Sequence, residues 1–402
     1  MKKTYQKGAA LIIFALVIVL VATTFLVSKL DAYSIDVERN KKTTAALAEA
    51  KAALIGSVAG VPNIAIPAHL PNPDLKLSAL IPEGNQAGMA GAVDLSLLGK
   101  FPWRSLGVLP LKDGWNECLW YVVSGRFKNS PPTNALNWDT QGQITVIDNN
   151  ANVLGTKLAA LIVSPSTTLI GQDRQLVAID TPQCGGNYDA RNYLDTFNAI
   201  NAVAGALNYF AGSPNNRQAL NTNDKTFVLT KNDFYNDHFI FITVDEIFNP
   251  LIRRSDFKAR IDSLLDDSDF RLQAETGHFE TVVIAGTKGV DNINCNLIVN
   301  IDNQTFCNNW KEMLLLTELS PAAPITIDGI ASAASCSRVL IFGGQKVGAQ
   351  SRITAVDKSL VANYLEGINL AEFNTPIANG SNFSGVSIFN SSNSSADILK
   401  CI

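Results

Sequence analysis

The sequence predicts an α+β protein in which a long N-terminal transmembrane/amphipathic helix packs on an antiparallel sheet, with an additional α+β region after it. Three observations predict this class. An apolar run near the start continues without proline into good helix formers, short β-rich runs follow between turn residues, and helix-like and strand-like segments alternate after residue 188. With 402 residues, 47% hydrophobic and 17% charged, the chain can bury a sizeable core.

The first element is an apolar run at residues 9–28 that carries no charged side chain. A helix of this length, rising about 1.5 Å per residue, crosses about 30 Å of hydrocarbon. Lys2, Lys3 and Lys7 precede it, which places the N-terminus in the cytoplasm and the rest of the chain outside. A cleaved secretory signal would have a shorter apolar core and a small-residue cleavage site. A plain single-pass anchor is the alternative to the interpretation developed below.

The apolar run leads into residues 29–60, which lack proline and are rich in Ala, Leu, Glu and Lys. Leu26, Tyr33, Val37, Leu47 and Leu54 share one stripe at helical spacing. Glycines near residue 60 and the proline that follows end the pattern. Residues 9–60 are therefore predicted to form one helix whose outer half packs on a globular head.

The start of the chain resembles the type IV pilins and the pseudopilins of type II secretion. Lys7-Gly8 followed by "AALII" carries the resemblance, because in these families a prepilin peptidase cuts after the glycine of a short basic leader. The resemblance implies cleavage between Gly8 and Ala9 and assembly of the exposed helix with other pilin or pseudopilin subunits. It assigns the helix contacts to Leu11, Ile13, Phe14, Leu26, Val37, Leu47 and Leu54.

The chain departs from the pilin pattern at the fifth mature position, which is Ile13 where most pilins have Glu. That Glu neutralises the amino terminus of a neighbouring subunit, and an unpaired ammonium in an apolar core is costly. The Ile indicates a low-copy or tip subunit. The resemblance implies a protein of the inner membrane with a periplasmic head, associated with a filament or the cell surface. A tip-presented adhesin and a tethered periplasmic enzyme are the alternative functions.

The head is predicted at residues 61–187. Residues 61–93 are rich in Pro and Gly and are expected to form loops. The segment "DGWNECLWYVV" at 113–123 is similar to the one with which pseudopilin heads begin their sheet, although Gly114 stands where the family has Pro. We expect Trp115 to pack on the helix, 119–123 to form a strand, and 143–148 and 157–164 to form a hairpin. The string from "LPNPD" to "GQITV" also resembles a group of large pilin-like proteins of Gram-negative bacteria.

The rest of the chain divides into a helical region at 188–275 and a β-rich region at 276–402. Helices are expected at 192–212 and 245–267, with a strand at 237–244 between them. In the last region, strands are expected at 280–286, 295–301, 325–330 and 337–348, a short helix at 308–319, and an ordered edge strand near Cys401. The complete set of predicted divisions is a leader at 1–8, a helix at 9–60, a head at 61–187, and the regions 188–275 and 276–402.

The six cysteines favour disulfides in an oxidising compartment, because none forms a CxxC pair and none has a histidine at ligand spacing. Cys295 and Cys307 enclose a short loop and are the first expected pair. Cys118 with Cys184 and Cys336 with Cys401 would complete the set. The sequence alone leaves the connectivity open, and free buried thiols remain the alternative.

No motif points to catalysis, and we expect no enzyme, no metal and no cofactor. His69, His238 and His278 are interpreted as structural, the GxSxG elbow is absent, and the glycines of "RVLIFGGQKVG" lack phosphate-loop spacing. Oxygen-rich stretches at 148–152 and 266–269 are candidates for Ca²⁺, for which solvated turns are the plain interpretation. The five tryptophans are expected in the core. A net charge of −4 argues against nucleic acid as a partner.

Overall fold

The computed structural model describes residues 7–61, 68–76, 80–89, 91–133, 135–148, 150–169, 172–175, 183–195, 225–231, 235–275, 293–332, 335–374, 382–385 and 397–402. Only the backbone is described at 7–18, 20–32, 225, 274–275, 318–321, 323 and 374. The chain is a mixed α+β protein with several small antiparallel sheets, as the sequence predicts.

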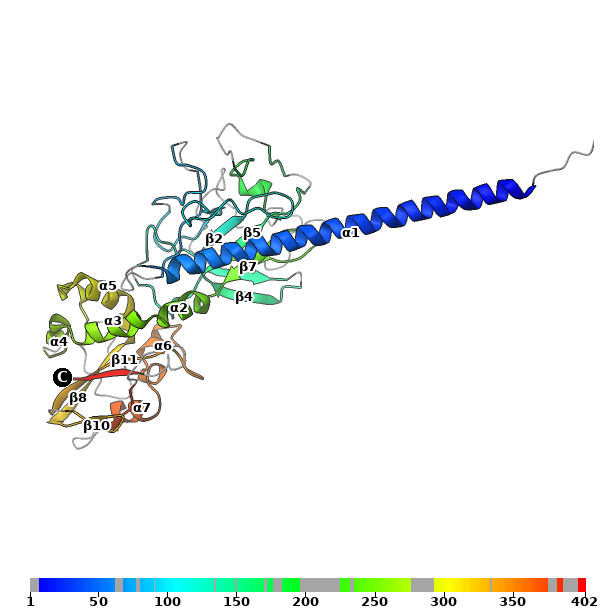
Figure 1. Cartoon of the computed structure of the whole chain (residues 1–402). Helices are drawn as coiled ribbons and strands as arrows, with labels where there is room; N and C mark the ends of the chain where they lie inside the picture. Colours follow the sequence, from blue (N-terminus) through cyan, green and yellow to red (C-terminus); the bar gives the residue numbers. More distant parts are fainter. Residues whose placement is uncertain are drawn as a thin grey trace, which may run out of the picture.

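Helix α1 runs from Lys7 to Ala59 and projects from the head as a single rod (Figure 1). Its last four turns carry the buried side chains Leu47, Ala50, Leu54 and Val58, which pack into the core of the head. Within the part of the chain that the structure describes in full, no helix is long and apolar enough to cross a membrane.

The main sheet of the head has the strand order β1-β2-β5-β7 and is antiparallel throughout. Its strands are β1 (Leu97–Lys100), β2 (Trp120–Val123), β5 (Ala160–Ser164) and β7 (His238–Ile242). Alternate side chains of β2 face opposite ways, with Tyr121 in the core shared with α1 and Trp120 in a second core on the outer face. Because both faces are covered, β1, β2 and β5 are buried along their whole length.

A second sheet has the order β4-β3-β6 and corrects the predicted hairpin. Strand β3 (Ile144–Ile147) pairs antiparallel with β4 (Val153–Leu158) and parallel with β6 (Lys225–Val228). The Asp148 carboxylate accepts the N–H groups of Asn150 and Asn152, which closes a tight turn and starts the return strand at Val153. The part of the predicted partner from Ala160 onward belongs to the main sheet instead. The two sheets also extend past the predicted head boundary at residue 187, since β6 and β7 follow it.

Helices α2 (Val244–Ile252), α3 (Ser255–Leu265) and α4 (Ser268–Glu275) follow β7. Thr243 and Glu246 form a capping box that starts α2. The strand predicted at 237–244 is confirmed as β7. The helix predicted at 245–267 is helical but divides into α2 and α3 at Arg253 and Arg254. Of the helix predicted at 192–212, the structure describes only the end of a short 3₁₀ turn, η1 (Ala190–Asn192), and residues up to 195; the rest lies outside the described residues.

The C-terminal region is built on a three-stranded antiparallel sheet, β13-β11-β8. Its helical elements are η4 (Cys295–Leu297), α5 (Ile301–Trp310), η5 (Lys311–Met313), α6 (Ala355–Ser359), η6 (Val361–Asn363) and α7 (Gly367–Asn374). Its strands are β8 (Leu314–Ala323), β9 (Thr326–Ile327), β10 (Ile330–Ala331), β11 (Cys336–Phe342), β12 (Asn382–Phe383) and β13 (Ile398–Cys401). The expected ordered strand at Cys401 is confirmed as β13.

Two predictions in this region are wrong. The strand predicted at 295–301 is the 3₁₀ turn η4, because Asn294 caps it and Cys295 is bonded to Cys307 on α5. The helix predicted at 308–319 ends at Trp310, and Leu314 to Leu316 lie in β8, where they pair with β11. The strand predicted at 280–286 lies outside the described residues.

One hydrophobic core runs from α1 through the head into the C-terminal region. It contains Leu54 of α1, Tyr121 of β2, Phe257 of α3 and Phe342 of β11 in a single cluster. Trp138 links its parts, since its ring lies 4.6 Å from that of Trp310 and 6.1 Å from that of Phe342. The two regions are therefore held together by apolar packing.

Candidate functional site

The candidate functional element is the arm of α1 that leaves the head. Where the head begins, α1 contacts it at Arg39, whose guanidinium lies 5.8 Å from the Trp115 ring centroid, and at Thr43, whose hydroxyl accepts the N–H of Gly114 at 2.9 Å. Before these contacts, Tyr33 and Val37 are exposed, at 71% and 49%. The described side chains from Tyr33 to Glu38 are therefore exposed on this arm.

The residues that the sequence assigned to helix assembly fall into two groups. Leu47 and Leu54 are buried in the core between α1 and the head, so their side chains serve the attachment of the head. Val37 lies on the exposed arm. Gly8 and Ala9 lie in the first turn of α1, and the side chains of Leu11, Ile13, Phe14 and Leu26 lie outside the described residues. The predicted single stripe is thus divided at the point where the head begins.

The turn at Asp113 attaches the head to α1. The buried Asp113 carboxylate accepts hydrogen bonds from the N–H groups of Trp115 (2.9 Å), Glu117 (3.0 Å) and Ser166 (3.0 Å) and from the Ser164 hydroxyl (2.7 Å). This fixes the turn so that Gly114 approaches the helix backbone. A Cβ atom at Gly114 would lie 2.2 Å from the Arg39 carbonyl oxygen. Trp115 packs beside the helix, as the sequence predicts.

The end of α1 is attached by two cations that sequence reasoning did not identify. The Arg254 guanidinium donates to the carbonyl oxygens of Ala59 (3.1 Å) and Val61 (2.6 Å) and is oriented by Asp256. A cation at this place also complements the negative end of the helix dipole. Lys51 donates to the Phe241 carbonyl at 2.9 Å and pairs with Glu246. The signal for Glu246 was present in the sequence as the capping box, and Arg254 had none.

All three expected disulfides are present: Cys118–Cys184, Cys295–Cys307 and Cys336–Cys401, with Cα atoms 5.5, 5.6 and 5.3 Å apart. The pairings that the sequence left open are therefore confirmed. The six cysteines form three pairs and leave no free thiol.

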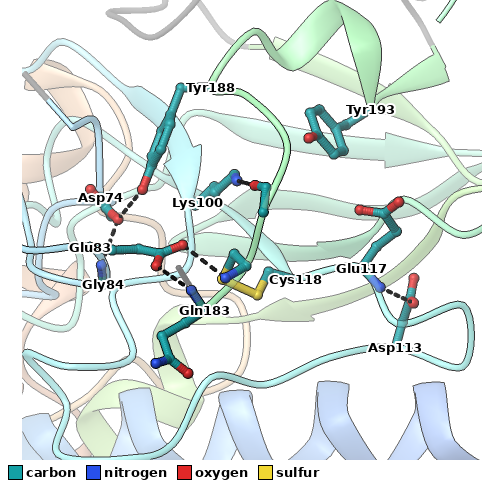
Figure 2. The surroundings of a disulfide bond; sticks show 12 residues. Asp74, Glu83, Gly84, Lys100, Asp113, Glu117, Cys118, Gln183, Tyr188 and Tyr193 are labelled. Atoms are coloured by element: carbon teal, nitrogen blue, oxygen red, sulfur yellow. Dashed lines mark hydrogen bonds between the residues drawn. A yellow bond between two sulfur atoms is a disulfide. The ribbon is translucent and has the colours of Figure 1, made fainter. Parts of the chain in front are cut away.

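Figure 2 shows the polar residues around Cys118–Cys184. The Glu83 carboxylate accepts the N–H groups of Gln183 (2.9 Å) and Cys184 (3.0 Å), as the dashed lines show. Lys100 donates to the Gly185 carbonyl at 3.0 Å and lies 4.5 Å from the Tyr188 ring centroid. These bonds, together with the disulfide, hold the segment that begins at Gln183 against the sheet.

Burial changes the acid–base properties of the same cluster. It lowers the pKa of Lys100 to about 8 and raises the pKa of Asp74, whose carboxylate accepts a 2.7 Å hydrogen bond from the Tyr188 hydroxyl. Lys100 is 3% exposed and Asp74 1%. Their hydrogen bonds go to neighbouring loops, so the cluster holds these loops together.

The next candidates are the histidines and the two oxygen-rich stretches. Burial lowers the pKa of His69 to about 4 and lowers that of His238, which begins β7; His278 lies outside the described residues. Asp148 closes the β3–β4 turn, and Asp267 accepts N–H groups from Asp269 and Phe270 at the start of α4. In the described ranges, no group of three or more His, Cys, Asp or Glu could hold a metal.

The last two candidates are the tryptophans and the glycine pair after β11. Trp103, Trp120, Trp138 and Trp310 are buried, as the sequence predicts. The N–H of Gly344, in the glycine pair after β11, donates to the carboxylate of Asp397 at 3.2 Å.

Comparison with known proteins adds no relative: no family model, curated protein or solved structure matches this chain.

Proposed function

We propose that this chain is a membrane-anchored, pilin-like subunit that assembles through the arm of α1 into a type IV pilus or type II secretion-type filament. The observation that carries the proposal is the arm itself: it is helical from Lys7, it extends beyond the head, and the apolar residues 9–28 follow directly behind Gly8. An apolar run of this length favours an apolar environment, which a membrane or the helices of neighbouring subunits would supply.

The division of α1 supports this function. The half that carries Leu47 and Leu54 is occupied by the head, and its end is held by Arg254 and Lys51. A force or contact applied to the arm is therefore passed to the head through fixed polar and apolar contacts. We therefore assign the assembly contacts of the proposed filament to residues before Arg39.

Ile13 supports a low-copy or terminal position in the filament. A subunit without Glu at this place cannot neutralise the amino terminus of a neighbour. Its partners are the inner membrane, a prepilin peptidase and other pilin or pseudopilin subunits, with the head in the periplasm.

The first test is the mature N-terminus, measured by mass spectrometry of the full chain in cells with an active prepilin peptidase. The expected product begins at Ala9, and Gly8→Leu is expected to remain uncleaved. Lys7→Ala, which keeps the glycine, is the matched control and is expected to be processed. A wild-type chain that still begins at Met1 would overturn the proposal and leave a plain anchor.

The second test concerns assembly. Ile13→Glu restores the residue that most pilins have, so it is expected to increase the amount of this subunit recovered in sheared filaments. Ile12→Glu places the same charge one position earlier and is the control that is expected to give no increase. Equal recovery of the two variants would contradict the role assigned to position 13.

A further inference from the structure

Two buried aspartates join the segment 183–195, which lies over the outer face of the main sheet, to the start of β7. Asp195 and Asp237 are 6% and 5% exposed. The Asp237 carboxylate accepts the N–H of Asp195 at 3.1 Å, and the Asp195 carboxylate accepts the N–H groups of Asn236 at 2.5 Å and Asp237 at 2.9 Å. Each carboxyl group thus holds the backbone that carries the other.

The surroundings of the pair supply little positive charge. Gln172 donates to Asp195 at 3.1 Å, and one oxygen of Asp237 accepts no hydrogen bond. The cation that acts on the pair is Arg174, which is already ion-paired with Glu117 at 3.3 Å and lies 5.0 Å from the Tyr193 ring centroid.

The other groups near the pair do not neutralise it. His238, the next residue along β7, has its ring 6.1 Å from that of Trp115. Among the described residues, neither aspartate forms an ion pair within 4 Å of a Lys, Arg or His nitrogen.

Two carboxylates buried together cannot both be ionised without a compensating cation. Burial raises the pKa of Asp195 to about 6. Burial and repulsion by Asp195 raise the pKa of Asp237 well above its ordinary value. The pair therefore keeps a proton to a higher pH than two separate aspartates would.

We propose that Asp195 and Asp237 form a proton-operated clasp that holds the segment 183–195 over the outer face of the main sheet. While the two carboxyl groups share a proton, they hold the segment to β7; when both are ionised, their repulsion releases the end at Asp195, while Cys184 stays bonded to Cys118. On the side of the segment that faces the sheet, Tyr193 packs on Trp120 of β2 with ring centroids 5.0 Å apart, and Leu194 is buried. Release would expose this apolar face of the head to a partner or to solvent.

The direction of the pH response follows from the raised pKa values. The folded clasp binds more protons than the unfolded chain, so its contribution is fully present below the unfolded aspartate pKa of about 4 and is lost as pH rises through the raised pKa values of both carboxyl groups. The clasp is therefore tight in acid and loosens in alkali.

Hydrogen exchange followed by mass spectrometry on the full chain in detergent tests the clasp. After correction for intrinsic exchange rates, protection at 183–195 and 235–238 is expected to fall about tenfold or more from about pH 5 to about pH 8. Asp237→Asn cannot ionise and still offers a donor to Asp195, so it is expected to retain protection at both values. Asp195→Asn gives the same expectation if the first variant folds poorly.

Asp397→Asn is the matched control, since it removes another buried carboxyl group in the C-terminal region and is expected to leave the loss at 183–195 unchanged. Equal loss of protection in wild type and Asp237→Asn would overturn the proposal, as would full protection of the wild type in alkali. Millimolar Ca²⁺ is the second probe. If it restores protection in alkali, a metal ion and not the proton closes the pair, which would also overturn the proposal.

Discussion

Gly114 shows how one missing side chain positions a whole domain. The turn that contains it donates to Thr43 and lies against the backbone of Arg39, closer than any residue with a Cβ atom could lie. The Asp113 carboxylate holds this geometry from the sheet side. The position of the head on α1 at this point is thus decided by sterics between two backbones.

Gly114→Ala is expected to lower the free energy of unfolding by about 1–3 kcal/mol, because the added methyl group forces the turn away from the helix. Urea unfolding monitored by tryptophan fluorescence measures the loss. Gly56→Ala is the matched control: its Cβ would meet nothing within 4 Å, and alanine is the better helix former by about 1 kcal/mol. A loss at Gly56 as large as at Gly114 would contradict the steric explanation.

The buried side chain of Asp397 makes the stability of the fold depend on pH. Burial and the nearby Glu366 raise its pKa to about 7, although Asn369 donates to it at 2.8 Å and Arg352 acts in the opposite direction. Its folded pKa exceeds the unfolded value of 3.8, so stability is present in acid and is lost as pH rises from about 4 through 7.

The expected result is that Asp397→Asn unfolds with a free energy that changes less between about pH 5 and about pH 8 than that of the wild type. The difference in slope is measured by denaturant titrations at each pH. Parallel curves for the two proteins would show that Asp397 does not titrate in this window.

Helix α1 shows at the element scale how one stripe serves two surfaces. The sequence placed Val37, Leu47 and Leu54 on one face of the helix, and nothing in their spacing distinguishes one from another. Only the two that meet the head are buried. Periodicity therefore identified the apolar face and not the place along it where the head ends.

Leu54→Ala is expected to cost about 2–5 kcal/mol of unfolding free energy, since it leaves a cavity between α1 and the sheet. Val37→Ala on the exposed arm is expected to change stability by no more than about 0.5 kcal/mol. Chemical denaturation of both variants makes the comparison. Similar costs at the two positions would show that the packing of the head on α1 extends as far as Val37.

The disulfides also act on whole elements. Cys336–Cys401 ties β13 to β11 across 65 residues of sequence, whereas Cys295–Cys307 ties η4 to α5 across 12. If restriction of the unfolded chain dominates, the longer loop stabilises by about 4 kcal/mol and the shorter by about 3 kcal/mol. Paired Cys→Ala variants, compared by unfolding free energy under non-reducing conditions, test that order. A larger loss of unfolding free energy from removing Cys295–Cys307 would show that this bond acts mainly on the folded state and not by restricting the unfolded chain.

At the scale of the whole molecule, the head and the C-terminal region are joined by a buried ion pair as well as by the continuous core. Arg352 and Asp139 are 3.2 Å apart, with side chains 0% and 1% exposed. Arg352 also donates to the Gly344 carbonyl. Asn309 binds the backbone of Leu136 and the side chain of Asn137 at the same junction.

Asp139→Asn is expected to destabilise the chain by about 3–5 kcal/mol, because it leaves the Arg352 charge buried beside a neutral group. Combining it with Arg352→Met removes both charges and is expected to recover most of the loss. Differential scanning calorimetry follows both variants and shows whether the C-terminal region melts separately. A double variant no more stable than Asp139→Asn would mean that the pair contributes through shape and not through charge.

Local signals in the sequence determined several parts of this protein. Prolines and glycines marked the end of α1, β-branched runs marked β2, β3 and β7, and the spacing of Cys295 and Cys307 indicated their bond. The apolar run behind Gly8 also carries the proposed function. These features depend on neighbouring residues, because helix ends, turns and short loops are decided by local geometry.

Tertiary structure alone decided the rest. Leu314 to Leu316 form a strand and not a helix because β11 offers backbone partners and a buried face, and an unbroken apolar run fits either element. The Arg254 cap, the Asp139–Arg352 pair and the Asp195–Asp237 clasp each join residues more than 40 positions apart. Burial and distance between such residues set their energies, and neither quantity exists until the chain has folded.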